Sequence, residues 1–572
     1  MIIHSIYFIF FSIVILISIL GYGLVFQRIF LNNINYSNLS VSGVFGLFLL
    51  YIISSISHLF FAHDYIHNLI IHIFGIAAFI YNGSKSKIDK EQLKLIFIFF
   101  VVLFVGFLIS KTNEDFPYYH LPNSLQFAEN KLQFGLGNLN HGFKHFSSLF
   151  LINSLFYLPV VKYYLFNITN FIFQIFFFSG LIIFLNQKKF DNFFKILASL
   201  SIIILLSKFY RLSEYGSDIP GQFLVILSFL YCVYLTSLNK KSSQEITGIL
   251  SIIIYLNLFA ISTKFIYLIY LLIPVAIVLF ALNFKKIILE ILNIKLILLS
   301  LFSILFLIFF NFSSTGCLIY PIEFTCFDEK FNWSLKKDTV SYLNLHYEAW
   351  AKAGKGTGYN IENVKEYVKG LNWIDNWVDK YFFNKFSDYL LVILFILIVY
   401  CVTFFQEIKN NNLKKIKNLK FFLINLTSLI IIFIFWFLNF PTLRYAGYAI
   451  VFLLISYPSS YVLMNKIDFS DGKVIKKIKI LVLITLVIFN VRNINRINQE
   501  LNLPENQNHN FKNFPFYWVD DVRYEKVKIN NFTLYKVQDS KMCWNIPSTC
   551  IRTLSGLNVI KKNGYKFYFY KK

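Results

Sequence analysis

Long apolar runs separated by short polar breaks fill the chain from its start to about residue 492. Many of these runs reach the roughly 20 residues that a helix needs to cross a bilayer. The pattern predicts an all-α polytopic membrane protein with about 14 transmembrane helices. The predicted spans lie at about 5–26, 41–62, 66–82, 94–110, 163–186, 192–208, 220–238, 247–261, 265–283, 290–312, 388–406, 419–440, 444–463 and 476–492.

One shorter apolar run, 146–160, does not fit a pattern in which successive loops lie on alternate sides of the membrane. It ends at Pro159, and if it crossed the membrane, the basic loop 186–195 would fall on the outer side. We therefore expect this run to lie in the membrane interface or to enter it only halfway.

Lysine residues collect in the short connections between apolar runs. The 572-residue chain has 54 Lys and Arg against 30 Asp and Glu, which gives a formal net charge of +24. Basic loops stay on the cytoplasmic side of a membrane, so the positive charge predicts how the helices are oriented in the membrane. This explains the charge without a nucleic acid, and we expect no nucleic acid partner. The predicted cytoplasmic loops are 84–94, 186–195, 238–245, 283–286, 409–420 and 468–477.

The same assignment places the long polar stretches on the opposite side, which we take as the periplasmic face of a bacterial inner membrane. It divides the chain into N-terminal transmembrane helices (1–93), a transmembrane module (94–492) with outer loops 111–162 and 313–387, and a C-terminal cap (493–572). Alternating polar and apolar residues in the cap predict short strands. We expect a small, soluble α/β or β-containing unit there.

Four of the six cysteines form two close pairs on the predicted outer side. Cys317 pairs with Cys326, and Cys543 with Cys550, if the bonds are local. Two short-range pairs in one compartment predict disulfides and an oxidising exterior. Zinc is the competing interpretation, but the spacings are long and no histidine pair accompanies them. The other two cysteines lie in apolar runs and are expected to be inert thiols.

The polar stretch from Lys111 to His145 is the most unusual part of the chain. It follows an apolar run directly and contains Glu114, Asp115 and His120. A carboxylate at the mouth of a membrane helix costs free energy unless it is solvated, paired or used. Simple solvation of the acids and interfacial packing of the histidine are the competing interpretations.

Further polar residues lie at predicted outer helix ends. Carboxylates there can deprotonate a hydroxyl or bind a divalent cation, and an arginine can donate bidentate hydrogen bonds to a phosphate. Acids before a proline also form turns, and a terminal arginine also anchors to headgroups, so both interpretations stay open. The residues are Glu214, Asp218, Lys264, Tyr320, Arg444 and Tyr445.

The segments DFPYYHLP, FGLGNLNHGF, EYGSDIP, YP and PTLRY, followed by a CW…C tail, occur in this order. This order resembles the GT-C superfamily of membrane glycosyltransferases, and looks closest to poorly characterised bacterial membrane proteins assigned to it. The resemblance covers the chain from about residue 94 onward. It implies that Asp115, or Glu114, stands at the catalytic carboxylate position, and that 146–160 is a juxtamembrane helix.

The resemblance also implies an activity. A hexose or pentose would move from a polyprenyl-phosphate-linked donor to a lipid or glycan acceptor at the periplasmic face, among membrane lipids, in cell-surface glycan assembly. The first loop has no DxD motif, so the need for a divalent cation stays open, and no other cofactor is implied. The implied substrate-binding residues are His120, Glu214, Asp218, Lys264, Tyr320, Arg444 and Tyr445.

Three alternatives compete with this interpretation. A lipid-linked polysaccharide polymerase or ligase relies on outer-loop arginines, and the loop 313–387 contains none. A transporter or flippase of lipid-linked sugars places ionisable residues deep within its spans, whereas the charges here collect at helix ends. A non-catalytic scaffold whose tail recruits partners is the third alternative.

Overall fold

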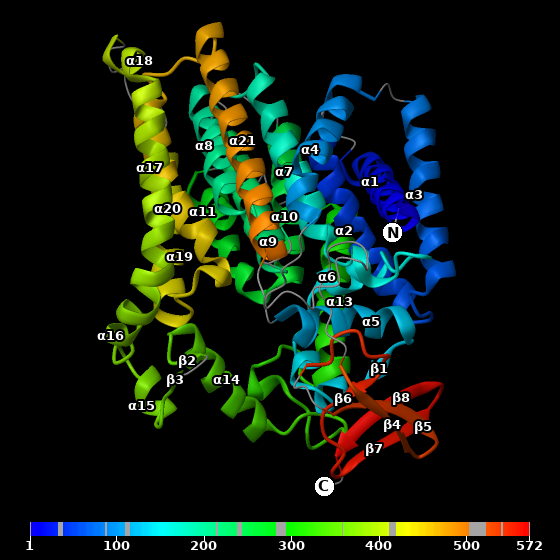
Figure 1. Ribbon diagram of the computed structural model, residues 1–572. Coiled ribbons are helices and arrows are strands. Elements are labelled where there is room, and N and C mark those ends of the chain that lie inside the picture. Colours follow the sequence, from blue (N-terminus) through cyan, green and yellow to red (C-terminus); the bar gives the residue numbers. More distant parts are fainter. Residues whose placement is uncertain are drawn as a thin grey trace.

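The apolar runs fold as helices, which satisfy their own backbone hydrogen bonds in a hydrocarbon environment. Figure 1 shows a computed structural model of the chain as a helical bundle with a small group of strands at one end. The structure describes residues 2–31, 38–85, 88–108, 115–212, 216–236, 243–281, 293–356, 359–410, 419–502, 522–538 and 542–570.

The bundle has a helix at each predicted span, but in the described part of span 265–283 the 3-10 helix η5 (Phe265–Leu271) and the ten-residue α11 (Leu272–Ala281) stand in place of one long helix. Among the described residues, eleven helical segments are long and apolar enough to cross a membrane. This confirms the polytopic α-helical fold, while the total of about 14 spans stays a prediction. The helices are α1 (Ile2–Phe30), α2 (Leu39–His58), α3 (Tyr65–Lys85), α4 (Lys90–Leu108), α7 (Ile168–Asn186), α8 (Asn192–Lys208), α9 (Asp218–Thr236), α10 (Ser243–Thr263), α11 (Leu272–Ala281), α13 (Ile294–Thr315), α17 (Ser387–Thr403), α19 (Leu419–Asn439), α20 (Tyr448–Leu463) and α21 (Gly472–Asn502).

The helix α9 lies at the centre of the bundle. Every residue from Asp218 to Thr236 is buried, so this helix has no face toward lipid. A helix that is apolar all round is a core helix, and a charged residue at its first position must find partners inside the protein. By contrast, α17 and α19 each expose large apolar side chains along one face, as lipid-facing helices do.

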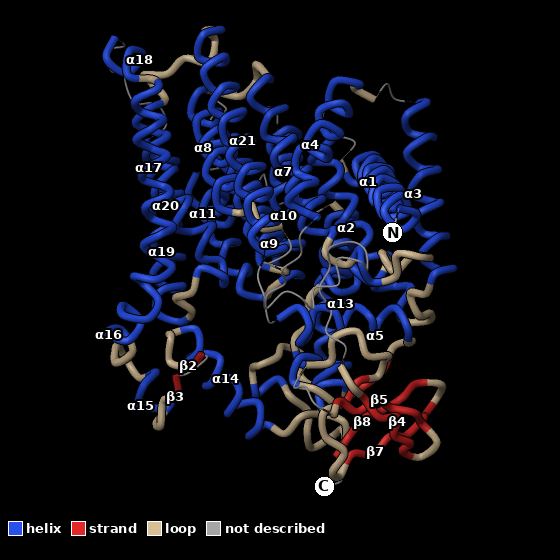
Figure 2. Tube along the Cα trace, viewed as in Figure 1, coloured by secondary structure: helices blue, strands red, loops and turns tan. Residues whose placement is uncertain are grey.

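The polar segments gather at the two ends of the bundle. In Figures 1 and 2, the α3–α4 connection and α18 (Phe405–Asn410) lie at one end, while α5 (Leu121–Glu129), α14 (Lys337–Ala351) and the strands lie at the other. The helix ends at α3, α4 and α18 are therefore separated from α5, α14 and the strands by the length of the helices. Which end faces the periplasm stays a prediction.

The first outer loop is built of short helices. The π-helix η1 (Phe116–His120) leads into α5, and α6 (Ser148–Ser154) is a seven-residue helix capped by the Ser147 hydroxyl. A helix of this length is too short to cross a bilayer, which agrees with the expectation that 146–160 does not span. The loop also contains β1 (Gln133–Phe134), η2 (Leu136–Asn138) and η3 (His141–Lys144), and η4 (Tyr163–Leu165) follows it.

Two small sheets confirm a β-containing C-terminal region. One consists of β4 (Tyr524–Ile529), β5 (Phe532–Val537) and β6 (Cys550–Ile551). The other joins the antiparallel pair β7 (Leu557–Lys562) and β8 (Tyr565–Tyr570) to β1, which runs parallel to β8 with Gln133 opposite Lys566. The C-terminal strands and the first outer loop thus form one hydrogen-bonded unit.

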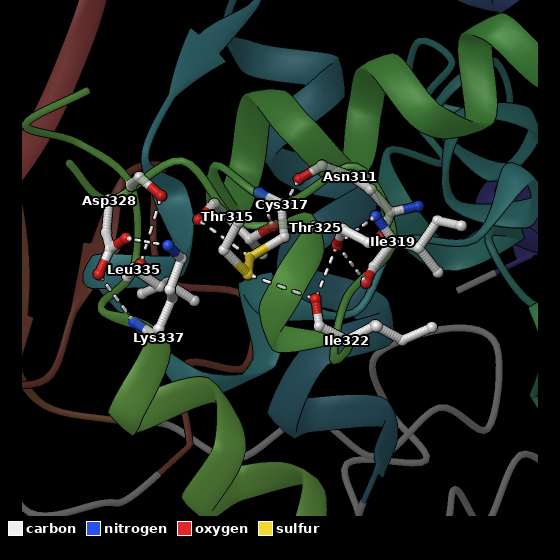
Figure 3. The surroundings of a disulfide bond; sticks show 11 residues. Asn311, Thr315, Cys317, Ile319, Ile322, Thr325, Asp328, Leu335 and Lys337 are labelled. Atoms are coloured by element: carbon white, nitrogen blue, oxygen red, sulfur yellow. Dashed lines mark hydrogen bonds and ion pairs between the residues drawn. A yellow bond between two sulfur atoms is a disulfide. The ribbon is translucent and has the colours of Figure 1, made fainter. Parts of the chain in front are cut away.

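Both predicted disulfides are present. Cys317–Cys326 closes a turn directly after α13, and Figure 3 shows the surrounding hydrogen bonds, in which the Thr325 hydroxyl donates to the Ile322 carbonyl (2.7 Å). Cys543–Cys550 closes the turn before β6. The rest of the second outer loop contains η6 (Glu323–Thr325), α14, β2 (Lys355–Gly356), β3 (Tyr359–Asn360), α15 (Val364–Val368), α16 (Ile374–Trp377) and η7 (Val378–Phe386).

The two disulfides predict how many free thiols the protein carries. Denatured but unreduced protein should react with maleimide at only two of the six cysteines, Cys232 and Cys401, and at all six after reduction. Cys543→Ser should raise the unreduced count to three because it frees Cys550. Intact mass spectrometry measures these counts, and six labels without reduction would contradict the pairing.

Candidate functional site

Four charged side chains from four distant elements meet at the end of the bundle that carries the outer loops. Asp115 precedes η1, Asp218 begins α9, Lys264 lies between α10 and η5 (Phe265–Leu271), and Arg444 lies in η8 (Leu443–Gly447). Arg444 forms ion pairs with both Asp115 and Asp218, and its Nε donates to Asp218 Oδ2 over 2.8 Å. Lys264 forms a second ion pair with Asp218. The structure therefore brings together four of the residues that the sequence singled out; their roles stay a prediction.

The four charges balance, but the two carboxylates differ in exposure. The Asp218 side chain is 1% exposed and has two cationic partners, whereas Asp115 is 26% exposed and has one. A buried carboxylate without such partners would be strongly destabilising. Burial by itself raises the pKa of Asp115, but the adjacent Arg444 guanidinium outweighs burial and leaves that pKa below its ordinary value.

An interrupted helix start presents Arg444 to the two carboxylates. Within η8, Tyr445 has φ −93° and ψ 72°, and Ala446 has a positive φ of 65°. The regular helix α20 begins only at Tyr448. The break leaves backbone groups without helical partners, and inside a membrane protein such groups need other hydrogen bonds.

Side chains from neighbouring elements supply these hydrogen bonds. The Trp377 indole donates to the Pro441 carbonyl (2.7 Å), and the Trp436 indole donates to the Thr442 carbonyl (3.1 Å). The Leu443 amide donates to the Tyr381 hydroxyl (2.8 Å), and the Tyr270 hydroxyl donates to the Ala446 carbonyl (3.0 Å). The segment that carries Arg444 is thereby fixed in place before any ligand binds.

Gln222 connects this segment to α9. It lies one turn after Asp218, so both side chains point from the same face of the helix. Its amide nitrogen donates to the Leu443 carbonyl (3.0 Å), and its amide oxygen accepts from the Ala449 amide (2.7 Å). The side chain bridges the break and sets the distance between Asp218 and Arg444.

Two aromatic residues border the charged cluster. The Trp350 ring, at the end of α14, lies 5.9 Å from the Arg444 guanidinium carbon and 5.9 Å from the Tyr445 ring. The Lys264 ammonium lies 5.3 Å from the Tyr445 ring. Trp350 is 37% exposed, whereas the other tryptophans of the second outer loop, Trp333, Trp373 and Trp377, are buried. The cluster thus has one accessible aromatic face beside its guanidinium.

His120 lies behind the carboxylates. Its Nε2 is buried and makes no hydrogen bond to any described residue, and its ring contacts Gly216, where a Cβ would lie 2.1 Å from the imidazole. Burial lowers the pKa of His120 to about 4, against the opposing effect of Asp115 and Asp218, so the ring is neutral at pH 7. It lines a small pocket whose other polar residues are Asn153, Asn167, Thr169, Asn170 and Ser217, and whose apolar residues include Leu149, Phe150 and Phe166.

Tyr320 does not join the charged cluster. Its hydroxyl is hydrogen-bonded to the Tyr347 hydroxyl (2.7 Å), which in turn is hydrogen-bonded to His141 Nε2 (2.9 Å). The His145 ring packs on Tyr320 at 5.6 Å. This second aromatic cluster joins η3 to the second outer loop, and it supports the site from outside rather than forming part of it.

Two predicted site residues, Glu114 and Glu214, lie outside the described residues. Over the described part of the chain, no group of three or more His, Cys, Asp or Glu side chains could hold a metal ion. The need for a divalent cation, which the sequence leaves open, gains no support from these residues.

Neither Gln222 nor Trp350 is among the residues that the sequence singled out. An amide in an otherwise apolar core helix, one turn from a carboxylate, is a signal that could have identified Gln222, because an unpaired polar group there is costly. Nothing local distinguishes Trp350 from its neighbours.

One protein-family model, described as a domain of unknown function (DUF8201), matches residues 6–452. No curated protein and no solved structure matches the chain.

We expect Gln222→Leu to loosen the segment that carries Arg444. The change leaves the Ala449 amide without its side-chain partner, at a cost of roughly 1–3 kcal/mol, and it removes one of the two hydrogen bonds to the Leu443 carbonyl, which keeps the one from the Tyr448 amide. Hydrogen exchange of residues 441–449 should become faster. Gln174→Leu is the matched control, because it removes another buried glutamine bond, to the Phe209 carbonyl (2.9 Å), elsewhere in the bundle. Equal exchange in the two variants would contradict the bridging role.

We expect His120 to reduce stability at acid pH. Its pKa of about 4 in the folded protein lies below the unfolded value of 6.5, so the unfolded state binds the proton first as the pH falls. Stability should decrease from about pH 7 toward pH 4, by roughly 3 kcal/mol at most from this group. Thermal denaturation in detergent should show a weaker pH dependence for His120→Gln, and an unchanged dependence would contradict the assignment.

Proposed function

The chain belongs to the family described as a domain of unknown function (DUF8201), and we propose that it is a glycosyltransferase. It moves a sugar from a polyprenyl-phosphate-linked donor to a lipid or glycan acceptor at the outer face of the membrane. One observation carries this proposal: Asp115 and Asp218 share the guanidinium of Arg444, with Lys264 beside them, at the end of the bundle where the outer loops lie.

The reaction needs a proton acceptor and a group that binds phosphate, and the cluster supplies both. The acceptor hydroxyl oxygen attacks the anomeric carbon, and the bond from that carbon to the phosphate oxygen breaks. The Asp115 carboxylate takes the hydroxyl proton. The leaving phosphate keeps the electron pair, and Arg444 and Lys264 stabilise its charge. Asp218 holds the two cations in position.

The surroundings of the cluster suit a lipid-linked sugar. Trp350 offers an exposed ring beside Arg444, on which a sugar face can pack. The charges lie at helix ends, with Asp218 at the first residue of α9, rather than at the mid-membrane position that a transporter would use. Two disulfides at this end support an oxidising compartment such as the periplasm.

The test is reconstitution of purified protein with a panel of polyprenyl-phosphate sugars. Asp115→Asn should lower turnover by about 10²- to 10⁴-fold, the usual contribution of a general base. Asp379→Asn, at an exposed position of the second outer loop, should leave turnover unchanged. Undiminished turnover in Asp115→Asn would remove this residue from the mechanism, and Glu114→Gln tests the alternative base.

A further inference from the structure

Counted over the described residues, the charged cluster is electrically neutral before a substrate binds. Two carboxylates face two cations, and Arg444 is paired with the residue that would act as the base. We propose that the donor phosphate displaces Asp115 from Arg444, so that substrate binding itself frees the catalytic carboxylate. This inference rests on the proposed function, and it adds the order of events at that site.

The contacts decide which carboxylate leaves. Asp218 is 1% exposed and is held by both Lys264 and the Arg444 Nε, whereas Asp115 is 26% exposed and, among the described residues, is held only by Arg444 Nη2. A buried carboxylate that loses its partners is strongly penalised, and this penalty is smaller for Asp115 than for Asp218, because water reaches Asp115. An incoming anion therefore competes with Asp115 and leaves Asp218 in place.

The guanidinium presents a suitable edge to the anion. Nε is used by Asp218, and within the described residues Arg444 Nη1 has no hydrogen-bond acceptor. A phosphate that binds Nη1 and Nη2 together forms the bidentate pair that arginine favours, and it takes the donor that Asp115 uses. Because the backbone of η8 is fixed, Arg444 stays in position, and Asp115 at the start of η1 is the group that moves.

Displacement from Arg444 makes the Asp115 carboxylate a stronger base. Arg444 lowers the pKa of the paired carboxylate, which makes it a weak base. Once the guanidinium is occupied by phosphate, burial dominates and the basicity of the carboxylate rises. The base is then competent only when a donor is bound.

The total charge is conserved through the cycle. A singly charged phosphodiester binds to the neutral cluster, and the step ends with a protonated Asp115 and a doubly charged polyprenyl phosphate facing Arg444 and Lys264. Asp115 can form its ion pair with Arg444 again only after it has lost its proton. Deprotonation of Asp115 thus accompanies release of the product lipid.

The test measures binding of decaprenyl phosphate to the full chain in nanodiscs of neutral phosphatidylcholine. Asp115→Asn removes the competing carboxylate, so it should bind this lipid about two- to fivefold more tightly than the unsubstituted protein. Arg444→Gln should lose binding, and Asp379→Asn should match the unsubstituted protein. Equal or weaker binding by Asp115→Asn would overturn the proposal, even if that variant has lost turnover and the proposed function stands.

A second measurement uses the unsubstituted protein, so it does not depend on the folding of a variant. Decaprenyl phosphate should speed hydrogen exchange of the segment 116–120, because release of Asp115 removes a tether of η1. Slower or unchanged exchange on lipid binding would overturn the proposal. Tighter binding by Asp115→Asn with faster exchange, but without sugar transfer by any donor, would support the displacement and overturn glycosyl transfer.

Discussion

Asp218 imposes the constraint on which the site depends. A carboxylate that is 1% exposed, at the first residue of a fully buried helix, is tolerated only with cations in direct contact. This requirement places Lys264 at the break between α10 and η5 and Arg444 at the break before α20. Three helix ends are thereby fixed relative to one another, and Asp115 meets a guanidinium whose position is already set. The chemistry proposed for the outer end follows from this one buried charge.

The interrupted backbone around Arg444 shows how the fold accommodates such a site. Six backbone hydrogen bonds at and beside the break have side-chain partners, from α9, η5, the second outer loop or α19. Most of these partners are buried aromatic side chains, which supply apolar packing and a hydrogen bond together. Rigid elements that hold a reactive group in advance reduce the reorganisation needed when a charged substrate arrives.

Much of the architecture follows from local patterns, because hydropathy, lysine placement and cysteine spacing are local properties. These patterns predicted the helical membrane fold, both disulfides and the gathering of polar loops at one end. They could not predict that β1, only two residues long, pairs with β8 more than 400 residues away, or that Trp350 would be the tryptophan beside Arg444. Such contacts depend on tertiary packing, and the order of polar and apolar residues within one segment carries no information about it. Gln222 is an intermediate case, because the sequence shows a polar amide in an apolar helix but does not show which backbone groups this amide binds.

The contacts between the C-terminal strands and η1 tie the site to the order of synthesis. The Trp544 amide donates to the Pro117 carbonyl (3.0 Å), two residues from Asp115, and β8 completes the sheet that begins at Gln133. These partners leave the ribosome some 400 residues after the loop they secure. A nascent chain whose helices are already inserted therefore still lacks the C-terminal contacts that hold its first outer loop. The first outer loop gains these contacts only late in translation.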